Sequence, residues 1–479
     1  MESNFLLLTT LVAFFYSEED WKIFLCTTIL CFFIGLFCKW IGKKKENERF
    51  TRADSFLIVS LSWIVFSIIG CIPFIFLTPL DISSSFFETM SGFTTTGATV
   101  ISDIDGLSHA IKFWRSVMHW MGGLGIVVFS FALVPVYEMK NSNIYSAEVS
   151  GIGLDKVRPK IGATARRMLF IYLLFTVICA FMYWIGPMEG FDAICHAMST
   201  IATGGFSTHT ASIAYFHSQY IEYVAIFFML LSSVNFSLYY YLTIRNTSIL
   251  FKNEELRTFF KIVGFFTIVF ILLFYFVPAK NEIAGKLPQG IEETFRTALF
   301  HVSAIISSTG FSAQKFDYVA WGSCFWMPTV LIMAIGACAG STAGGIKIIR
   351  LLICIKSVFN EFVLQLHPRA VLGVRINGRI ITEERVRRTL SFIFLYCVLI
   401  VISTVFFTLL GSDIDTGIGS SISMLSNIGP ATGMTGPASN FSGVPAAGKW
   451  LMSFYMLIGR LEIFTVLFLF FPSFWKEKN

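Results

Sequence analysis

Four short segments of the chain end in hydroxyl-bearing or small residues next to a glycine, and their oxygen atoms could bind a cation. Their glycines are Gly97, Gly204, Gly310 and Gly429, separated by 107, 106 and 119 residues. Glycine tolerates positive φ, which lets successive carbonyls turn toward one side. Carbonyls from four sides can replace the hydration shell of a monovalent cation. The pattern therefore predicts a four-part ion filter with these residues: Thr95, Thr96 and Gly97; Ala202, Thr203 and Gly204; Ser308, Thr309 and Gly310; Asn427, Ile428 and Gly429.

Each glycine lies at the end of a short apolar stretch, and the four stretches with their glycines occupy residues 86–98, 195–205, 300–311 and 420–430. Stretches this short cannot cross a bilayer. The repeating unit is therefore a span, a half-length helix, a glycine-centred turn and a second span. Non-helical backbone at membrane depth is stable only in protein or beside a wet cavity, so the pattern favours one shared aqueous path. Glycines that serve only close helix packing are the alternative, but packing does not explain the half-length helices.

The elements that must position these turns follow from composition. The chain has 479 residues, of which 55% are apolar and 14% charged, and its mean hydropathy is +0.71. A soluble domain has about 25% charged residues, so these values predict an all-α polytopic membrane protein. We expect ten spans, the first of them shorter than a full crossing, at residues 4–16, 21–41, 54–77, 116–136, 168–186, 223–244, 259–277, 321–346, 389–410 and 450–472.

Charge is distributed unequally between the two sets of connecting loops. One set is net +15 and comprises residues 43–52, 137–168, 245–261, 347–388 and 473–479. The other set is net −8 and comprises residues 16–22, 78–115, 186–222, 278–321 and 411–450. By the positive-inside rule the first set and both termini are cytoplasmic. The outer face would then concentrate cations, with Glu88, Asp103 and Asp105 near its first filter strand.

Other residue types carry little chemistry. The ten cysteines lie in or beside apolar runs without a CxxC pair, which indicates small apolar residues rather than a metal or redox site. No nucleotide-binding or hydrolase motif is present in the sequence. The positive-inside bias accounts for the basic loops, so no nucleic-acid partner is expected.

Seven segments give the whole chain a resemblance to the TrkH/KtrB branch of the superfamily of K⁺ transporters. They are Thr94–Val100, Trp114–Val128, Ala193–Ser207, Ser308–Ser312, Gly336–Lys347, Ser426–Gly433 and Ile458–Leu467. Two extra N-terminal spans make the chain more similar to TrkH. The resemblance implies four membrane–pore–membrane repeats about a pseudo-fourfold axis. We assign residues 1–50 to the N-terminal two-helix extension and residues 51–140, 141–250, 251–365 and 366–479 to the four repeats.

Residues 334–345 interrupt an expected span, because four glycines there cost a helix about 1 kcal/mol each relative to alanine. The resemblance implies that this break is an intramembrane gating loop. An arginine at bilayer depth should face protein or a cavity and find acceptors, and the carbonyls freed by the break are candidates for Arg460. The resemblance gives Arg460 a role in the barrier to cations. The gate residues that we assign are Gly336, Cys338, Gly340, Ser341, Thr342, Gly344, Gly345, Lys347 and Arg460.

The resemblance implies K⁺ uptake across a bacterial inner membrane, with K⁺ as the transported ion and no bound cofactor. It also implies a homodimer and a TrkA-like nucleotide-binding regulator on the cytoplasmic side, where the basic residues 347–388 could dock it. A Na⁺- or H⁺-coupled K⁺ symporter on the same fold is one alternative. A polytopic membrane enzyme is another, although only Arg460 and Glu462 are charged and clearly deep in a span.

Overall fold

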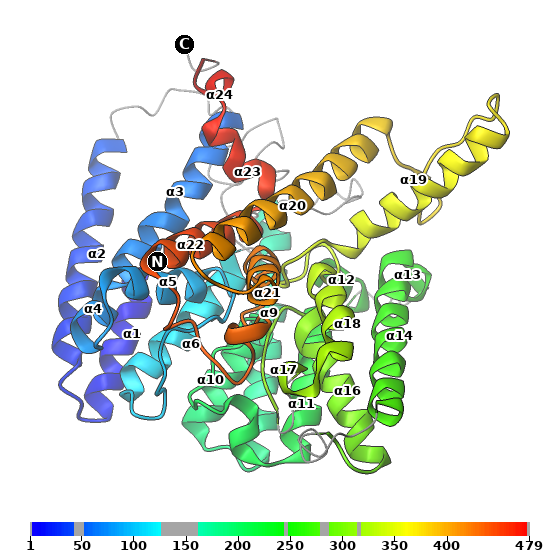
Figure 1. Cartoon of the computed structure of the whole chain (residues 1–479). Coiled ribbons are helices and arrows are strands. Elements are labelled where there is room, and N and C mark those ends of the chain that lie inside the picture. Colours follow the sequence, from blue (N-terminus) through cyan, green and yellow to red (C-terminus); the bar gives the residue numbers. More distant parts are fainter. Residues whose placement is uncertain are drawn as a thin grey trace.

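A computed structural model of the chain describes residues 2–42, 52–125, 161–243, 248–277, 287–313 and 318–476 (Figure 1). Up to residue 243 the helices are α1 (Glu2–Phe15), α2 (Trp21–Gly42), α3 (Arg52–Gly70), α4 (Ile72–Leu77), α5 (Ile82–Phe93), α6 (His109–Leu124), α9 (Ile161–Ile185), α10 (Gly190–Ile201), η3 (Ser212–Phe216), α11 (Gln219–Ser232) and α12 (Phe236–Thr243). Beyond it are α13 (Ser248–Lys252), α14 (Glu254–Phe276), α16 (Ile291–Ile306), α17 (Tyr318–Trp321), α18 (Ser323–Ala334), α19 (Ile348–Leu366), α20 (Glu383–Leu409), α21 (Ile414–Ser426), η4 (Gly433–Thr435), α22 (Ala446–Leu461), α23 (Ile463–Leu467), η5 (Phe468–Phe470) and α24 (Pro472–Lys476). A hairpin of β1 (Arg375–Ile376) and β2 (Arg379–Ile380) lies between α19 and α20.

Four half-length helices, α5, α10, α16 and α21, have 12, 12, 16 and 13 residues, and most of their residues are buried. They are the predicted half-helices, and each begins several residues before the predicted stretch. The helix after each of them packs on the half-length helix of the next repeat: α6 on α10, α11 on α16, α18 on α21, and α22 back on α5. This cyclic packing is the predicted pseudo-fourfold arrangement.

The N-terminal extension packs against the first repeat. Helix α1 contacts α2 and α6, and Glu18 after α1 accepts hydrogen bonds from the N–H groups of His109 and Ala110 at 2.7 and 3.0 Å. A carboxylate at these free N–H groups stabilises the start of α6. The 14 residues of α1 are fewer than a full crossing requires, as predicted.

Within the described residues, each of the ten predicted spans contains a helix, although fewer of these helices are long enough to cross a membrane alone. Among the described residues, five helices have that length and apolarity, and a pair bent by 119°, α22 with α23 and η5, would make a sixth. The predicted span at 116–136 begins in α6, and its residues 126–136 lie outside the described residues, as does residue 244 of the span at 223–244. The repeat boundaries predicted at 50/51 and 140/141 also lie outside them.

The second helices of the last three repeats are broken. The predicted break in the third repeat is confirmed, because α18 ends at Ala334 and α19 begins at Ile348. The expectation of continuous helices at 223–244 and 450–472 was wrong. Backbone at 233–235 separates α11 from α12, and Glu462, with φ of +65°, separates α22 from α23.

Helix α19 projects from the bundle beside the start of α20 (Figure 1). A small apolar cluster at its base joins three separate parts of the chain. It contains Ala339 from the break, Ile349 and Ile353 from α19, and Val374, Ile376 and Ile381 from the hairpin region. The hairpin is therefore packed onto the start of α19 and onto the break itself.

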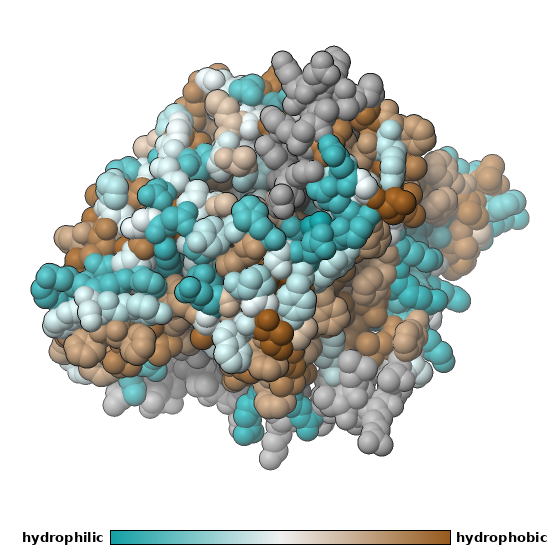
Figure 2. Space-filling view, turned by 90° about the horizontal axis from the view of Figure 1, so that it is seen from below, coloured by the Kyte–Doolittle hydropathy of each residue, from teal (hydrophilic) through white to brown (hydrophobic). Residues whose placement is uncertain are grey.

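The outer surface of the bundle suits a lipid environment. In long helices such as α2 and α20, only 11% and 22% of the most apolar 18-residue segment is buried. Figure 2 views the end that holds the connections into α10 and α16, where hydrophilic and hydrophobic residues are interspersed. All ten cysteines are free thiols, and some of them lie on exposed helix faces.

Candidate functional site

The four half-length helices end in the same backbone conformation. A non-glycine residue with positive φ follows or caps each helix, and a glycine with positive φ comes two residues later. The four pairs are Thr95 and Gly97, Thr203 and Gly205, Ser308 and Gly310, and Asn427 and Gly429, with φ between +53° and +99°. Left-handed non-glycine residues are costly, so four of them in equivalent places indicate a backbone shape imposed by the surroundings.

The second segment corrects the predicted register. The sequence pattern matched Gly204 with Gly97, Gly310 and Gly429 in the other three segments. In the structure it is Gly205 that has the positive φ, of +85°. The equivalent triplet is therefore Thr203, Gly204 and Gly205. Ala202 caps α10 in a right-handed conformation and lies one residue before the triplet.

The four strands form a closed ring in van der Waals contact. A Cβ built on Gly97 would overlap the carbonyl of Gly204, and one on Gly205 would overlap that of Thr309. In the same way, Gly310 faces the carbonyl of Ile428. Gly429 closes the ring against the carbonyl of Thr96. No side chain fits at these four positions, so glycine is needed for the close approach.

In the middle residue of each triplet, the N–H group is hydrogen-bonded and, among the described residues, the carbonyl is not. The N–H groups of Thr96, Gly204, Thr309 and Ile428 each donate to a carbonyl five residues back in their own half-length helix, at 2.9–3.0 Å. Within the described part of the chain, no N–H or O–H group donates to the carbonyls of these same residues. The ring therefore presents carbonyl oxygens whose hydrogen-bonding capacity is unused, and such oxygens are suitable ligands for a dehydrated cation.

The predicted gate residues lie directly against this ring. The N–H of Gly344 donates to Ser308 Oγ at 2.8 Å, and a Cβ on Gly344 would overlap the carbonyl of Ser426. Thr342 Oγ1 donates to the carbonyl of Ile201 at 3.3 Å, at the end of α10. The loop between α18 and α19 thus contacts the ends of three half-length helices.

The rest of the loop is stabilised by its own backbone and by α11 and α12. Gly336 N–H donates to Ile346 at 2.9 Å and Cys338 N–H to Ser233 at 3.1 Å, while the carbonyl of Gly340 accepts from Phe236 N–H at 3.0 Å. Other assigned residues complete the loop as follows: Ser341 Oγ donates to Cys338, Lys347 Nζ donates to Ala343, and Gly345 packs on Gly336.

Arg460 joins the loop to the first repeat. Its Nη1 donates to the carbonyl of Thr342 at 2.7 Å, which is one of the freed carbonyls that we expected it to meet. Its Nη2 donates to the carbonyl of Gly122 in α6 at 2.8 Å. No sequence pattern indicated this second acceptor. The side chain is 5% exposed, so its charge acts at short range on the loop and the ring.

Comparison with known proteins decides the family. A profile for TrkH, described as a cation transport protein, matches residues 19–477. The chain belongs to the TrkH family.

Members of the TrkH family match nearly the whole chain. The Trk system potassium uptake protein TrkH of Escherichia coli K12 is 36% identical over 99% of this chain and 96% of its own. TrkG of the same strain is 35% identical over 97% and 94%. The crystal structure of the potassium transporter TrkH from Vibrio parahaemolyticus superposes with a TM-score of 0.86 at 32% identity, covering 99% and 96% of the two chains. The protein is therefore a transporter and not an enzyme.

One buried ion pair of this TrkH-family chain joins two of the four strands of the ring. Arg115 Nε donates to Glu88 Oε1 at 3.0 Å, and both side chains are at most 1% exposed. Glu88 also accepts from Val100 N–H at 2.9 Å, and Arg115 donates to the carbonyl of Ser207 at 3.0 Å. The pair thus ties the first strand to the second. From the sequence, Glu88 was expected beside the first strand on a face that concentrates cations; it does lie beside that strand, but Arg115 and the backbone bury its carboxylate.

A histidine joins two carboxylates beside the hollow that the ring glycines line. His209 Nδ1 lies 2.6 Å from Asp105 Oδ1, and its Nε2 lies 3.1 Å from Asp192 Oδ2. His209 also lines the hollow above the four ring glycines. Burial alone would lower the pKa of His209, but hydrogen bonds and charge from Asp192 and Asp105 outweigh it and raise the pKa above 6.5.

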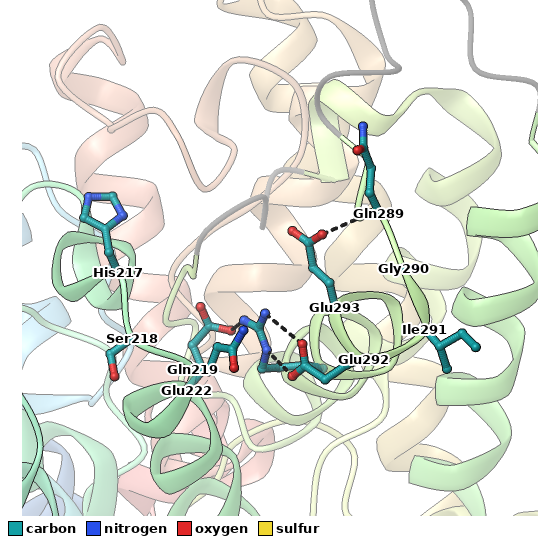
Figure 3. A pocket seen from close by; sticks show the side chains of 10 residues that line it. His217, Ser218, Gln219, Glu222, Gln289, Gly290, Ile291, Glu292 and Glu293 are labelled. Atoms are coloured by element: carbon teal, nitrogen blue, oxygen red, sulfur yellow. Dashed lines mark hydrogen bonds and ion pairs between the residues drawn. The ribbon is translucent and has the colours of Figure 1, made fainter.

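A separate hollow of about 420 Å³ opens where α11 and α16 begin (Figure 3). Arg296 binds Glu222 of α11, and its Nε donates to Glu292 Oε1 at 2.7 Å. Figure 3 shows Glu222 and Glu292 on neighbouring helices. The arginine thereby joins α11 of the second repeat to α16 of the third.

Removing the charge of Arg115 should destabilise the protein. In Arg115→Met the buried Glu88 carboxylate loses its counter-ion, and breaking a buried pair costs about 3–5 kcal/mol. We expect a lower apparent Tm in detergent, followed by intrinsic tryptophan fluorescence. Adding Glu88→Gln to the variant should restore part of the loss. Lys112→Met, one turn earlier on α6, is the control, and an equal effect there would contradict the assignment.

The His209 cluster should make stability depend on pH. Because the folded-state pKa is raised, the stabilisation is complete below pH of about 6.5 and is lost as the pH rises through the folded pKa. His209→Gln should therefore lower the apparent Tm by roughly 1–3 °C at pH 6 and by less at pH 9. Thermal unfolding of both proteins across this range measures the difference. A difference independent of pH would show that His209 contributes only packing.

Proposed function

We propose that the chain takes up K⁺ by conducting it through the ring of four filter strands. The observation that carries this proposal is the closed set of carbonyls at Thr96, Gly204, Thr309 and Ile428, which accept no hydrogen bond from the described residues. Relatives that match nearly the whole chain are named potassium uptake proteins, which supports K⁺ as the ion. The net −8 of the outer loops favours entry of cations from that side.

The loop between α18 and α19 is the proposed gate. It lies against the ends of three half-length helices, and Arg460 attaches it to α6. A buried positive charge near the path raises the electrostatic barrier to cations. Conduction would require the loop and the arginine to give up these contacts together.

The proposed setting is a bacterial inner membrane, with both termini and the α19 arm on the cytoplasmic side. Charge in the loops supports this orientation, because residues 347–388 carry nine basic and three acidic residues. A TrkA-like nucleotide-binding regulator would act on this face, since relatives are named as parts of a Trk system. We also propose that the chain works as a homodimer, as the family resemblance implies.

Substitution of a ring glycine tests the filter. Gly97 has φ of +79°, and a side chain there would overlap the carbonyl of Gly204. Gly97→Ser should therefore abolish growth on low-K⁺ medium when the gene is expressed in a bacterium that lacks its own K⁺ uptake systems. The matched control is Gly264→Ser, because that glycine has open space around it.

The outcome separates the proposal from its rivals. Rescue by the unchanged protein and by Gly264→Ser, but not by Gly97→Ser, supports uptake through the ring. Equal rescue by both variants would rule out this path. In proteoliposomes, uptake that stopped without Na⁺ or without a pH gradient would indicate a coupled symporter instead.

Removal of Arg460 tests the gate. Its hydrogen bonds to Thr342 and Gly122 are charge-assisted and contribute about 1.5–3 kcal/mol each. Their loss in Arg460→Ala should favour the open loop and raise K⁺ flux at least about tenfold in proteoliposomes without a regulator. Arg388→Ala changes an exposed arginine and should leave the flux unchanged. Unchanged flux in Arg460→Ala would exclude this role.

A further inference from the structure

Glu255 is a buried carboxylate beside the intramembrane loop that the mechanism above does not use. It is the second residue of α14 and is 7% exposed. Its Oε1 accepts a hydrogen bond from the N–H of Ala339 at 2.7 Å. Ala339 lies in the loop, next to Cys338, and is itself 1% exposed. A charged acceptor on a long helix is therefore bonded directly to the middle of the loop.

The same carboxylate reaches the helix that follows the loop. The backbone N–H of Ile349, the second residue of α19, lies beside Glu255. The first N–H groups of a helix have no partner within it, and a carboxylate placed there is stabilising. The N-cap residue of α19, Lys347, makes no side-chain capping bond of its own. Glu255 thus links the loop and the start of α19 to α14.

The neighbouring residue extends this junction to the cytoplasmic hairpin. Glu254 binds Lys356 of α19 at 2.5 Å, and it accepts from the N–H of Asn377 at 3.0 Å in the turn between β1 and β2. The apolar cluster that contains Ala339 and the hairpin residues packs at the same place. A displacement of the hairpin would consequently act on Ala339, which donates to Glu255, and on the start of α19.

We propose that Glu255 is a positioning residue of the gate, whose carboxylate holds the intramembrane loop and the start of α19 in the blocking arrangement. This inference rests on the proposed function of the loop as a gate. The physical reason is that a buried charge must keep its hydrogen bonds, so movement of the loop away from α14 leaves the carboxylate short of a donor. Loss of the charge removes that penalty and makes loop release easier.

Two readouts on the full-length protein test the proposal. In Glu255→Gln proteoliposomes without a regulator, K⁺ flux should rise by about fivefold or more, since the neutral amide binds the N–H of Ala339 less strongly than the carboxylate does. Cys338, which is 1% exposed, should react faster with N-ethylmaleimide in detergent. Mass spectrometry of the Cys338 peptide measures this rate, and it reports loop release whether or not the protein conducts.

Three further variants sharpen the test. Glu384→Gln removes an exposed carboxylate that pairs with Arg388, and it should change neither readout. Glu255→Asp keeps the charge on a shorter side chain, so it should give intermediate flux and labelling. Should Glu255→Gln not yield folded protein, the Asp variant carries the test. Glu255→Ala removes both the acceptor and the charge, and it should match or exceed the Gln variant.

The outcomes distinguish this inference from the function on which it rests. Faster Cys338 labelling in Glu255→Gln with no K⁺ flux in any variant would support the positioning role of Glu255 and overturn the proposed function. If the unchanged protein conducts K⁺, and Glu255→Gln and Glu255→Ala show the same flux and labelling as it does, only the positioning role of Glu255 is overturned. A lower apparent Tm without faster labelling would also overturn it, because Glu255 would then have only a structural role.

Discussion

The whole structure depends on the rule that backbone polar groups at membrane depth must be satisfied within the protein. The breaks in the second and third repeats satisfy each other, because Cys338 N–H donates to Ser233 and Phe236 N–H donates to Gly340. In the filter strands the middle N–H groups return to their own half-length helices. With the donors occupied in this way, carbonyl oxygens remain as the polar groups available at the ring.

Across the described residues, several buried charged side chains contact backbone groups that have no hydrogen-bond partner within a helix. Arg115 with Glu88 ties the first two strands of the ring, Arg460 binds two carbonyls beside the loop, and Glu255 accepts from the N–H of Ala339 in the loop. A buried charge is expensive unless it is paired or fully hydrogen-bonded. Each of these groups is thus sensitive to the position of the backbone that it contacts, which favours one defined arrangement of strands and loop over slightly shifted ones.

The repeat period, the half-length helices and the long break in the third repeat could be predicted from the sequence, because glycine content and hydropathy change sharply there. The register of the second strand could not, since the pair Gly204–Gly205 does not show which residue takes the positive φ. Glu88 and Arg115 are 27 residues apart, and their pairing depends on how α5 packs on α6. The break at 233–235 contains no glycine or proline, and it is stabilised by contacts with a loop about a hundred residues later.

The long loop of the third repeat breaks the fourfold pattern and couples the proposed gate to the filter. Gly344 N–H donates to the side chain of Ser308, which is itself one of the strained left-handed residues, and Gly344 packs on the carbonyl of Ser426. A loop that left this position would remove a donor from Ser308 and a contact from the end of α21. Water or an ion would have to replace them, so opening of the loop and the exact shape of two filter strands are parts of one equilibrium.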